Sequence, residues 1–152
     1  LTDGPEAYRD LGEALRKHYD VPLPEGLVPG DDWDREAHRT AFLAFLHFIK
    51  RNHDGQTTVR VDRAWAGQSA VIQGFSSVLI PDHVLRETSL AEGLAFVGLE
   101  VGIDPPAPPE AAPETPFALA DIYDREIERT TKAAYQRDYM LFGFSPWKQD
   151  QK

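Results

Sequence analysis

The chain has 152 residues, of which 41% are hydrophobic and 11% aromatic, so it can bury the core of one compact domain. Its formal net charge of -9 argues against broad binding to nucleic acids or anionic membranes, because a polyanion is repelled overall. The chain has no cysteine, which excludes disulfides and thiolate metal sites, and no apolar run is long enough for a membrane-spanning helix.

Two helices are predicted in the N-terminal third. The first opens with Pro5 in its first turn, a position where proline is favoured, and continues with apolar residues at helical spacing. Proline and glycine then interrupt the chain as far as Asp31 and Asp32, either of which is expected to cap a second helix reaching about residue 52. The apolar arc of this second helix is broad, so we expect it to be buried on more than one side.

Short extended segments are predicted on both sides of a third helix. Residues 57–61 are β-branched at most positions and are expected to form a strand. A helix is expected over residues 62–75, followed by a second extended region at 78–80 and 82–86. The chain is therefore predicted to be mostly α-helical, with two or three short strands.

A fourth helix and a proline-rich connector are predicted next. Ser89 and Glu92 have the spacing of a capping box, and Gly102 is expected to end the helix that they open. Residues 104–116 hold six of the chain's 12 prolines and are expected to form an extended connector.

The tail is predicted to be one amphipathic helix that ends in an aromatic cluster. Asp121 can cap its start and Gly143 can end it. One face of this helix is expected to close a core, and it carries Ile127, Thr131, Ala134, Tyr135, Tyr139 and Phe142. We interpret residues 1–152 as a single domain, or as the C-terminal part of a larger one.

The densest polar cluster of the sequence surrounds Trp65. Arg60, Arg63 and Gln68 have the hydrogen-bond donors needed to bind a sulfate, a phosphate or a sugar group. The flat ring of Trp65 suits contact with a sugar ring. In the structural alternative, Arg60 pairs with Asp62 and Trp65 fills the core. The sequence leaves both interpretations open.

Familiar catalytic motifs are missing. The sequence has no G-x-x-x-x-G-K-[ST] loop, no G-x-G-x-x-G turn and no G-x-S-x-G elbow. No pair of its five histidines has convincing metal-ligand spacing, so no metal site is expected. His53 is a candidate base, although a lone loop histidine is more often only exposed. Arg86 and Glu87 form a candidate orienting pair or, more simply, a structural ion pair.

Three blocks in chain order, residues 60–68, 82–90 and 122–144, resemble the C-terminal half of bacterial sulfotransferase-family proteins related to carbohydrate sulfotransferases. The first is a Trp-x-x-Gln block, and the last ends in Arg-Asp-Tyr-Met-Leu-Phe-Gly-Phe. The resemblance implies an α/β parent fold, with a parallel sheet flanked by helices. It also implies transfer of a sulfuryl group from 3'-phosphoadenosine 5'-phosphosulfate to a hydroxyl of a sugar or small metabolite.

The sequence departs from this family pattern in the donor site. It contains neither the phosphosulfate loop nor the element that holds the donor's 3'-phosphate, and Ala64 stands where members often carry His. Because the chain also begins without Met, we expect a donor-binding N-terminal half to be missing and the chain alone to bind no cofactor. The residues expected to contact acceptor or sulfate are Arg60, Arg63, Trp65 and Gln68.

Two other functions are compatible with the sequence. One is a degenerate, non-enzymatic helical module that binds a protein or stabilises an oligomer, because an incomplete fold exposes apolar surface. The other is a glycan-binding module that uses Trp65. The expected partners are a sugar or small-molecule acceptor and either the missing half or a second copy, with no nucleic acid and no membrane. No secretory signal is visible, so the expected location is the cytoplasm.

Overall fold

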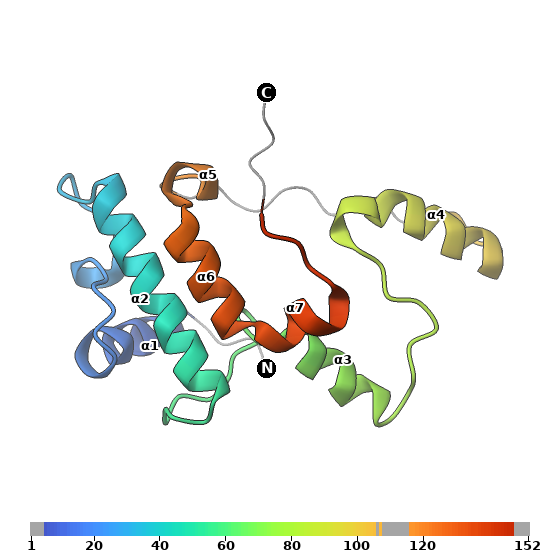
Figure 1. Ribbon diagram of the computed structural model, residues 1–152, viewed down its shortest axis with the longest axis horizontal. Helices are drawn as coiled ribbons and strands as arrows, with labels where there is room; N and C mark the ends of the chain where they lie inside the picture. Colours follow the sequence, from blue (N-terminus) through green and yellow to red (C-terminus); the bar gives the residue numbers. More distant parts are fainter. Residues whose placement is uncertain (1–4, 106, 108–115, 148–152) are drawn as a thin grey trace. The chain divides into compact units, whose positions relative to one another are not determined.

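The computed structural model describes residues 5–105, 107 and 116–147, and within these ranges the chain is mostly helical (Figure 1). It falls into two compact units, unit 1 (residues 1–71 and 115–152) and unit 2 (residues 72–114). The helices and single helical turns are α1 (Pro5–His18), η1 (Glu25–Leu27), α2 (Arg35–His53), α3 (Gln68–Ser76), η2 (Glu87–Ser89), α4 (Leu90–Val101), α5 (Leu119–Ile122), α6 (Arg125–Ala134) and α7 (Gln136–Phe142).

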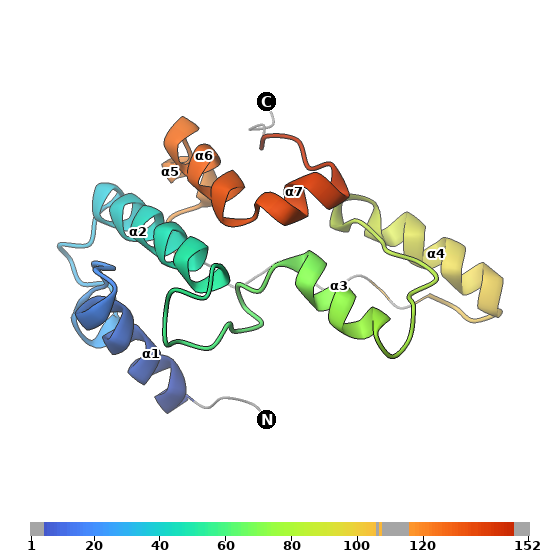
Figure 2. The ribbon, with the colours of Figure 1, turned by 60° about the horizontal axis from the view of Figure 1, so that its bottom comes forward.

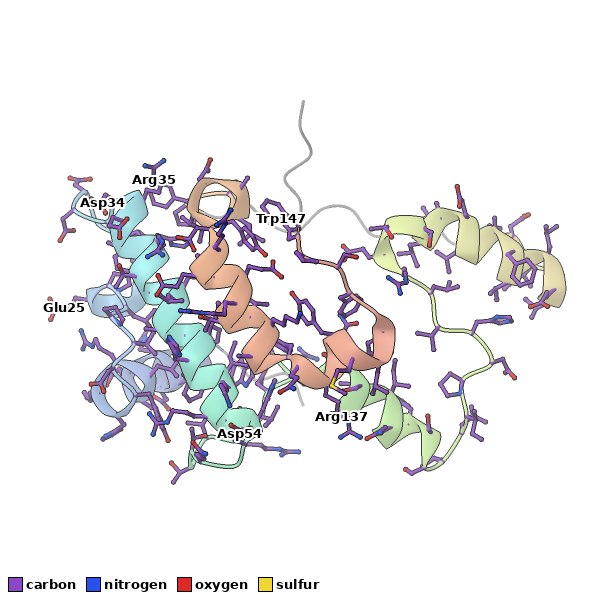
Figure 3. The ribbon with its side chains drawn as sticks, viewed as in Figure 1. Glu25, Asp34, Arg35, Asp54, Arg137 and Trp147 are labelled. Carbon is purple, nitrogen blue, oxygen red and sulfur yellow. The ribbon has the colours of Figure 1, made fainter. Side chains whose placement is uncertain are left out.

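The longest helix of unit 1 is α2, and its ends are defined by capping. The Asp34 side chain accepts a hydrogen bond from the backbone N–H of Ala37 at 2.8 Å, so the helix begins slightly later than the predicted caps at 31 and 32. Lys50, Arg51 and His53 occupy its last turn, where cations meet the partial negative end of the helix. Figure 3 labels Asp34 and Asp54 at the two ends.

The core of unit 1 forms where α2 meets α6, which lie side by side in Figures 1 and 2. Helix α6 buries residues at helical spacing, and α1 with the loop after it adds further apolar side chains. Full burial of one such side chain contributes about 1.5–3 kcal/mol. The buried core residues are Leu15, Val21, Leu46, Phe48, Ile49, Trp65, Ile127 and Ala134.

The tail is divided into three helices, so the prediction of a single helix is wrong. Asp124 interrupts the chain and begins α6 by accepting hydrogen bonds from two backbone N–H groups of its first turn. A second interruption falls at Tyr135, whose hydroxyl donates to the carbonyl of Trp65 at 3.0 Å. Gly143, with a left-handed φ of 62°, ends α7 as predicted.

The predicted strands do not form, and the described residues contain no β-strand. Residues 57–61 instead form a loop whose backbone polar groups bond to side chains: Asn52 Nδ2 donates to the carbonyl of Val59, and Thr58 N–H donates to the Tyr19 hydroxyl. Residues 78–80 and 82–86 have no strand beside them. A strand needs a paired neighbour, and β-branched composition alone supplies none.

The third helix also begins later than expected. Asp62 holds a turn in place of the first predicted helical turn, because its carboxylate accepts the N–H of Ala64 and its carbonyl accepts the N–H groups of Trp65 and Ala66. Helix α3 therefore starts only at Gln68.

In unit 2, residues 77–86 run without helix from the end of α3 to η2 and α4 (Figure 2). Leu85 lies on α4 at Gly93, where a Cβ atom would come within 2.7 Å of Leu85 Cδ2, so a larger residue at this position would require the Leu85 side chain to shift. His83 Nε2 lies 2.8 Å from Glu100 Oε2. These contacts place residues 77–86, which we call the linking segment, along α4.

The two ends of α4 follow the prediction only in part. Gly102, with φ of 71°, ends the helix, and its N–H donates to the carbonyl of Gly98. Ser89 occupies the N-cap position, but its side chain makes no capping hydrogen bond, so the predicted capping box is not formed. The connector predicted at 104–116 lies mostly outside the described residues.

An ion pair joins the two main helices of unit 1. Arg39 of α2 donates from Nε and Nη2 to Asp124 Oδ2 at 2.9 and 2.6 Å, and from Nη2 to Glu126 at 2.8 Å. The backbone N–H of Ile127, and to a smaller extent Arg39, hold the pKa of Asp124 below its ordinary value of 3.8, although desolvation opposes them. Asp124 thus caps α6 and ties it to α2.

Replacing Asp124 with Ala is expected to lower the free energy of unfolding near pH 7 by about 0.5–2 kcal/mol, the usual cost of losing an N-cap. A carboxyl with a depressed folded pKa stabilises above its unfolded pKa, and this stabilisation is lost as the pH falls through the folded value. Asp124→Ala should therefore also flatten the stability profile below about pH 4. Urea titrations at several pH values from about 2 to about 7 measure this change in the stability profile. Asp31→Ala, in an exposed loop, is the control, and an equal loss there would contradict the assignment.

Candidate functional site

Trp65 fills the core of unit 1, as the structural alternative predicted. Its side chain is 7% exposed, and its ring meets Phe45 and Phe48 edge to face. Its indole Nε1–H donates to Asn52 Oδ1 at 2.9 Å. A ring covered in this way has no open face for a sugar, so the expected stacking role of Trp65 is corrected.

The other three predicted site residues are exposed. Arg60 and Arg63 lie on the loop before α3, and Gln68 is the first residue of that helix. The expected pairing of Arg60 with Asp62 is not seen, since the Asp62 carboxylate caps the backbone N–H of Ala64 instead. The structure therefore separates Trp65 from its predicted companions, and the three exposed side chains remain open to solvent.

A buried carboxylate that the sequence did not single out lies next to this loop. Asp138 of α7 is 3% exposed and accepts the backbone N–H groups of Gln68 and Ser69 at 2.7 and 3.0 Å. It also accepts the Ser69 hydroxyl at 2.5 Å. The start of a helix favours negative charge, because its first N–H groups have no partner within the helix. Asp138 thus caps α3 from a distant part of the chain.

A second polar cluster surrounds His53, the candidate base. The imidazole Nδ1 lies 3.1 Å from the carbonyl oxygen of Ala134, and Nε2 lies 3.1 Å from that of Trp65. Tyr135 donates to the same Trp65 carbonyl, and burial, followed by the charge of Asp138, raises the pKa of this tyrosine to about 12. Both ring nitrogens face backbone acceptors, so His53 joins α2 to α6 rather than facing a substrate.

Neither a metal site nor a membrane span is found in the part of the chain that the structure describes. No group of three or more His, Asp or Glu side chains is close enough to hold a metal ion there. No described helix is both long and apolar enough to cross a bilayer. Glu87, the other sequence candidate, lies exposed in η2.

The most unusual surface of the protein is the apolar surface of unit 2. Leu99 on α4 is 84% exposed, and Val78 on the linking segment is 90% exposed. Large exposed apolar patches are rare on soluble monomers and mark interaction sites. We define the unit 2 surface by its exposed large apolar residues among the described ones, which are Phe75, Val78, Leu79, Ile80, Val84, Leu85, Phe96, Leu99, Val101 and Ile103.

Unit 2 has no hydrophobic core of its own among the described residues. All ten buried hydrophobic side chains belong to unit 1. On α4 only Gly98 is buried, and the backbone of Ile103 and the ring of Pro105 lie against it. A segment of this size buries too little apolar surface to offset the entropy of ordering its chain. A partner that covers the exposed apolar side chains of unit 2 would supply the buried apolar surface that this unit lacks.

Comparison of the chain with protein-family models, with curated proteins and with solved structures finds no match. The sulfotransferase resemblance of the three sequence blocks therefore stays a prediction.

Proposed function

We propose that the chain is a non-enzymatic module that binds a protein partner through the unit 2 surface. The observation that carries this proposal is the exposure of large apolar side chains on α4 and the linking segment, in a unit whose described residues include no buried hydrophobic side chain. Such a surface gains most from association, because burial on binding removes the same apolar area from water that burial in a core would.

Phe96 and Leu99 are the natural anchors of this surface. They stand on one face of α4 in successive turns, and both side chains are more than half exposed. Burying one such side chain fully is worth about 1.5–3 kcal/mol. Binding energy concentrates in a few large apolar or aromatic side chains at the centre of an interface, so these two should dominate the affinity.

Replacing Leu99 with Asp is expected to weaken partner binding strongly while leaving the fold intact, because the side chain is 84% exposed. The measurement compares proteins retained by the immobilised wild type and by Leu99→Asp, followed by titration of the purified partner. We expect saturable binding by the wild type and an affinity loss of at least about tenfold for the variant. Val28→Asp, at an exposed valine of unit 1, is the matched control.

Cysteine labelling locates the contact independently. The chain has no cysteine, so Leu99→Cys or Val28→Cys provides a single reactive site. The partner should slow maleimide labelling at position 99 and leave position 28 unchanged. Equal protection at both positions, or none at position 99, would overturn the proposal. Slow labelling at position 99 in the free chain would do so too, because the surface would then already be covered.

The sulfotransferase-like activity is the second proposal. It rests on the resemblance of the three blocks, and the exposure of Arg60 and Arg63 is the structural observation in its favour. Because the sequence lacks the donor loop, we expect no heat of binding when 3'-phosphoadenosine 5'-phosphate is titrated into this chain. Micromolar affinity that is lost in Arg60→Ala or Arg63→Ala would contradict that expectation and favour the enzymatic proposal.

A further inference from the structure

We infer that the partner of the unit 2 surface is a cationic amphipathic helix. The inference rests on the proposed function and adds the chemistry of the partner. It combines two observations, the helical spacing of the exposed apolar side chains on α4 and the negative charge around them.

The exposed stripe of α4 has the form of a helix-packing surface. Phe96 and Leu99 are three residues apart, with the small side chain of Ala95 beside them, so they form one ridge of the helix. A partner helix with apolar residues at positions i, i+3, i+4 and i+7 can pack against such a ridge. The stripe therefore fits a helix rather than an extended strand, because the described part of unit 2 offers no sheet edge.

Carboxylates accompany the stripe. Glu92 precedes Phe96 by one turn on the same face, and Glu100 follows Leu99 at the edge of that face. Both side chains are exposed, and Glu100 also meets His83. Lysine and arginine at the edges of a partner helix could lay their aliphatic stems on the stripe and reach these carboxylates with their charged ends.

The charge of the whole unit points the same way. Residues 72–114 contain seven Asp and Glu but a single Lys or Arg, Arg86. The five of these acids that the structure describes are all exposed. Such a surface attracts cations over a distance and repels nucleic acid and anionic lipid. It also disfavours a second copy of this chain, which would bring the same carboxylates to the contact.

Three labelled synthetic helical peptides test the inference against the whole chain by fluorescence anisotropy. All three have leucine at helical spacing, and their remaining positions carry Lys, Gln or Glu. We expect the Lys peptide to bind at least about tenfold more tightly than the Gln peptide, and the Glu peptide to bind least. Raising the salt from about 50 to about 300 mM should remove most of the difference, because salt screens exposed charges.

Variants assign this binding to α4. Glu92→Gln should weaken the Lys peptide about threefold or more and leave the Gln peptide unchanged. Glu25→Gln, at an exposed glutamate of unit 1, should affect neither peptide. Leu99→Asp should remove the binding of the Gln peptide and most of the binding of the Lys peptide, since the apolar anchor is lost.

The outcomes separate this inference from the proposed function. Equal binding of the Lys and Gln peptides, lost in Leu99→Asp, would overturn the cationic partner and leave the apolar contact standing. Binding of the Lys peptide that survives Leu99→Asp would overturn the helix-on-stripe geometry. If none of the peptides binds at about 100 μM, the inference is overturned. The proposed function is then tested separately by cysteine labelling at positions 99 and 28. Self-association that depends on Leu99, seen by sedimentation, would replace the cationic helix with a second copy.

Discussion

Replacing Trp65 with Ala is expected to lower the free energy of unfolding by about 3–5 kcal/mol, the range for removing a large aromatic side chain from a core. The indole is 7% exposed and packs against Phe45 and Phe48. Its loss also leaves the buried Asn52 Oδ1 without its donor, which adds the cost of an unsatisfied polar group. Because small domains are only marginally stable, much of the population would then be unfolded at room temperature.

Urea denaturation followed by circular dichroism measures this effect. Trp65→Phe keeps one aromatic ring against Phe45 and Phe48 but removes the Nε1 donor and part of the indole volume, so its loss should be smaller than that of Trp65→Ala, about 1–3 kcal/mol. Met140→Ala, at a 76% exposed position, should change stability by less than about 0.5 kcal/mol. If Trp65→Ala kept wild-type stability, Trp65 would not belong to the core and its proposed contact with a sugar would return.

Replacing Asp138 with Ala is the second large effect, with an expected loss of about 2–4 kcal/mol. The buried carboxylate accepts three hydrogen bonds at the start of α3, two from backbone N–H groups and one from the Ser69 hydroxyl. Each buried donor left without an acceptor costs about 1–3 kcal/mol, and the losses at one site do not add fully. The variant should therefore release the first turn of α3 in addition to lowering global stability.

Thermal unfolding and amide hydrogen exchange together test this role. In Asp138→Ala, the amides at the start of α3 should exchange faster than those of α2, because the cap is local to α3. Asp138→Asn keeps one carbonyl acceptor and should lose less. Asp10→Ala, on the exposed side of α1, is the control. Unchanged exchange at Gln68 and Ser69 would show that Asp138 does not cap the helix.

Local signals predicted much of the helical structure, because they depend only on neighbouring residues. Gly102 and Gly143 end α4 and α7 in the left-handed conformation that glycine adopts readily. The carboxylate that begins α3 could not be found in this way, since Asp138 lies 69 residues from Ser69 in the sequence. A helix cap is predicted from the residues next to the helix start, whereas the first N–H groups of α3 donate to Asp138, which is distant in the sequence.

The misplaced elements have a tertiary cause. The tail contains no proline or glycine at Tyr135, so its periodicity alone predicts one continuous helix. The structure instead interrupts the helix there, where the hydroxyl of this tyrosine reaches the Trp65 carbonyl. For residues 57–61, the composition favoured a strand, but strand formation depends on a neighbour that only the fold can supply.

The sequence showed which residue types could form a site, but it did not show which of those side chains the fold would bury and which it would expose. The sequence was compatible with Trp65 as a core residue or as a sugar contact and favoured the core, where the structure buries it. On α4, Leu90, Leu94 and Val97 were expected to form the apolar face, and they are only partly buried. The more exposed stripe of Phe96 and Leu99 shares the same helix, and sequence spacing does not show which face a fold leaves open.

The insertion of unit 2 within unit 1 has a consequence for how the protein is made. Helix α6, which completes the core beside α2, follows residues 72–114 in the sequence. During synthesis, which proceeds from the N-terminus, the face of α2 that packs on α6 stays in contact with water until residues 72–114 and α6 itself have left the ribosome. Closing the intervening loop then costs entropy that grows only slowly with its length. The length of unit 2 therefore bears more on the interval before the core closes than on the stability of the finished protein.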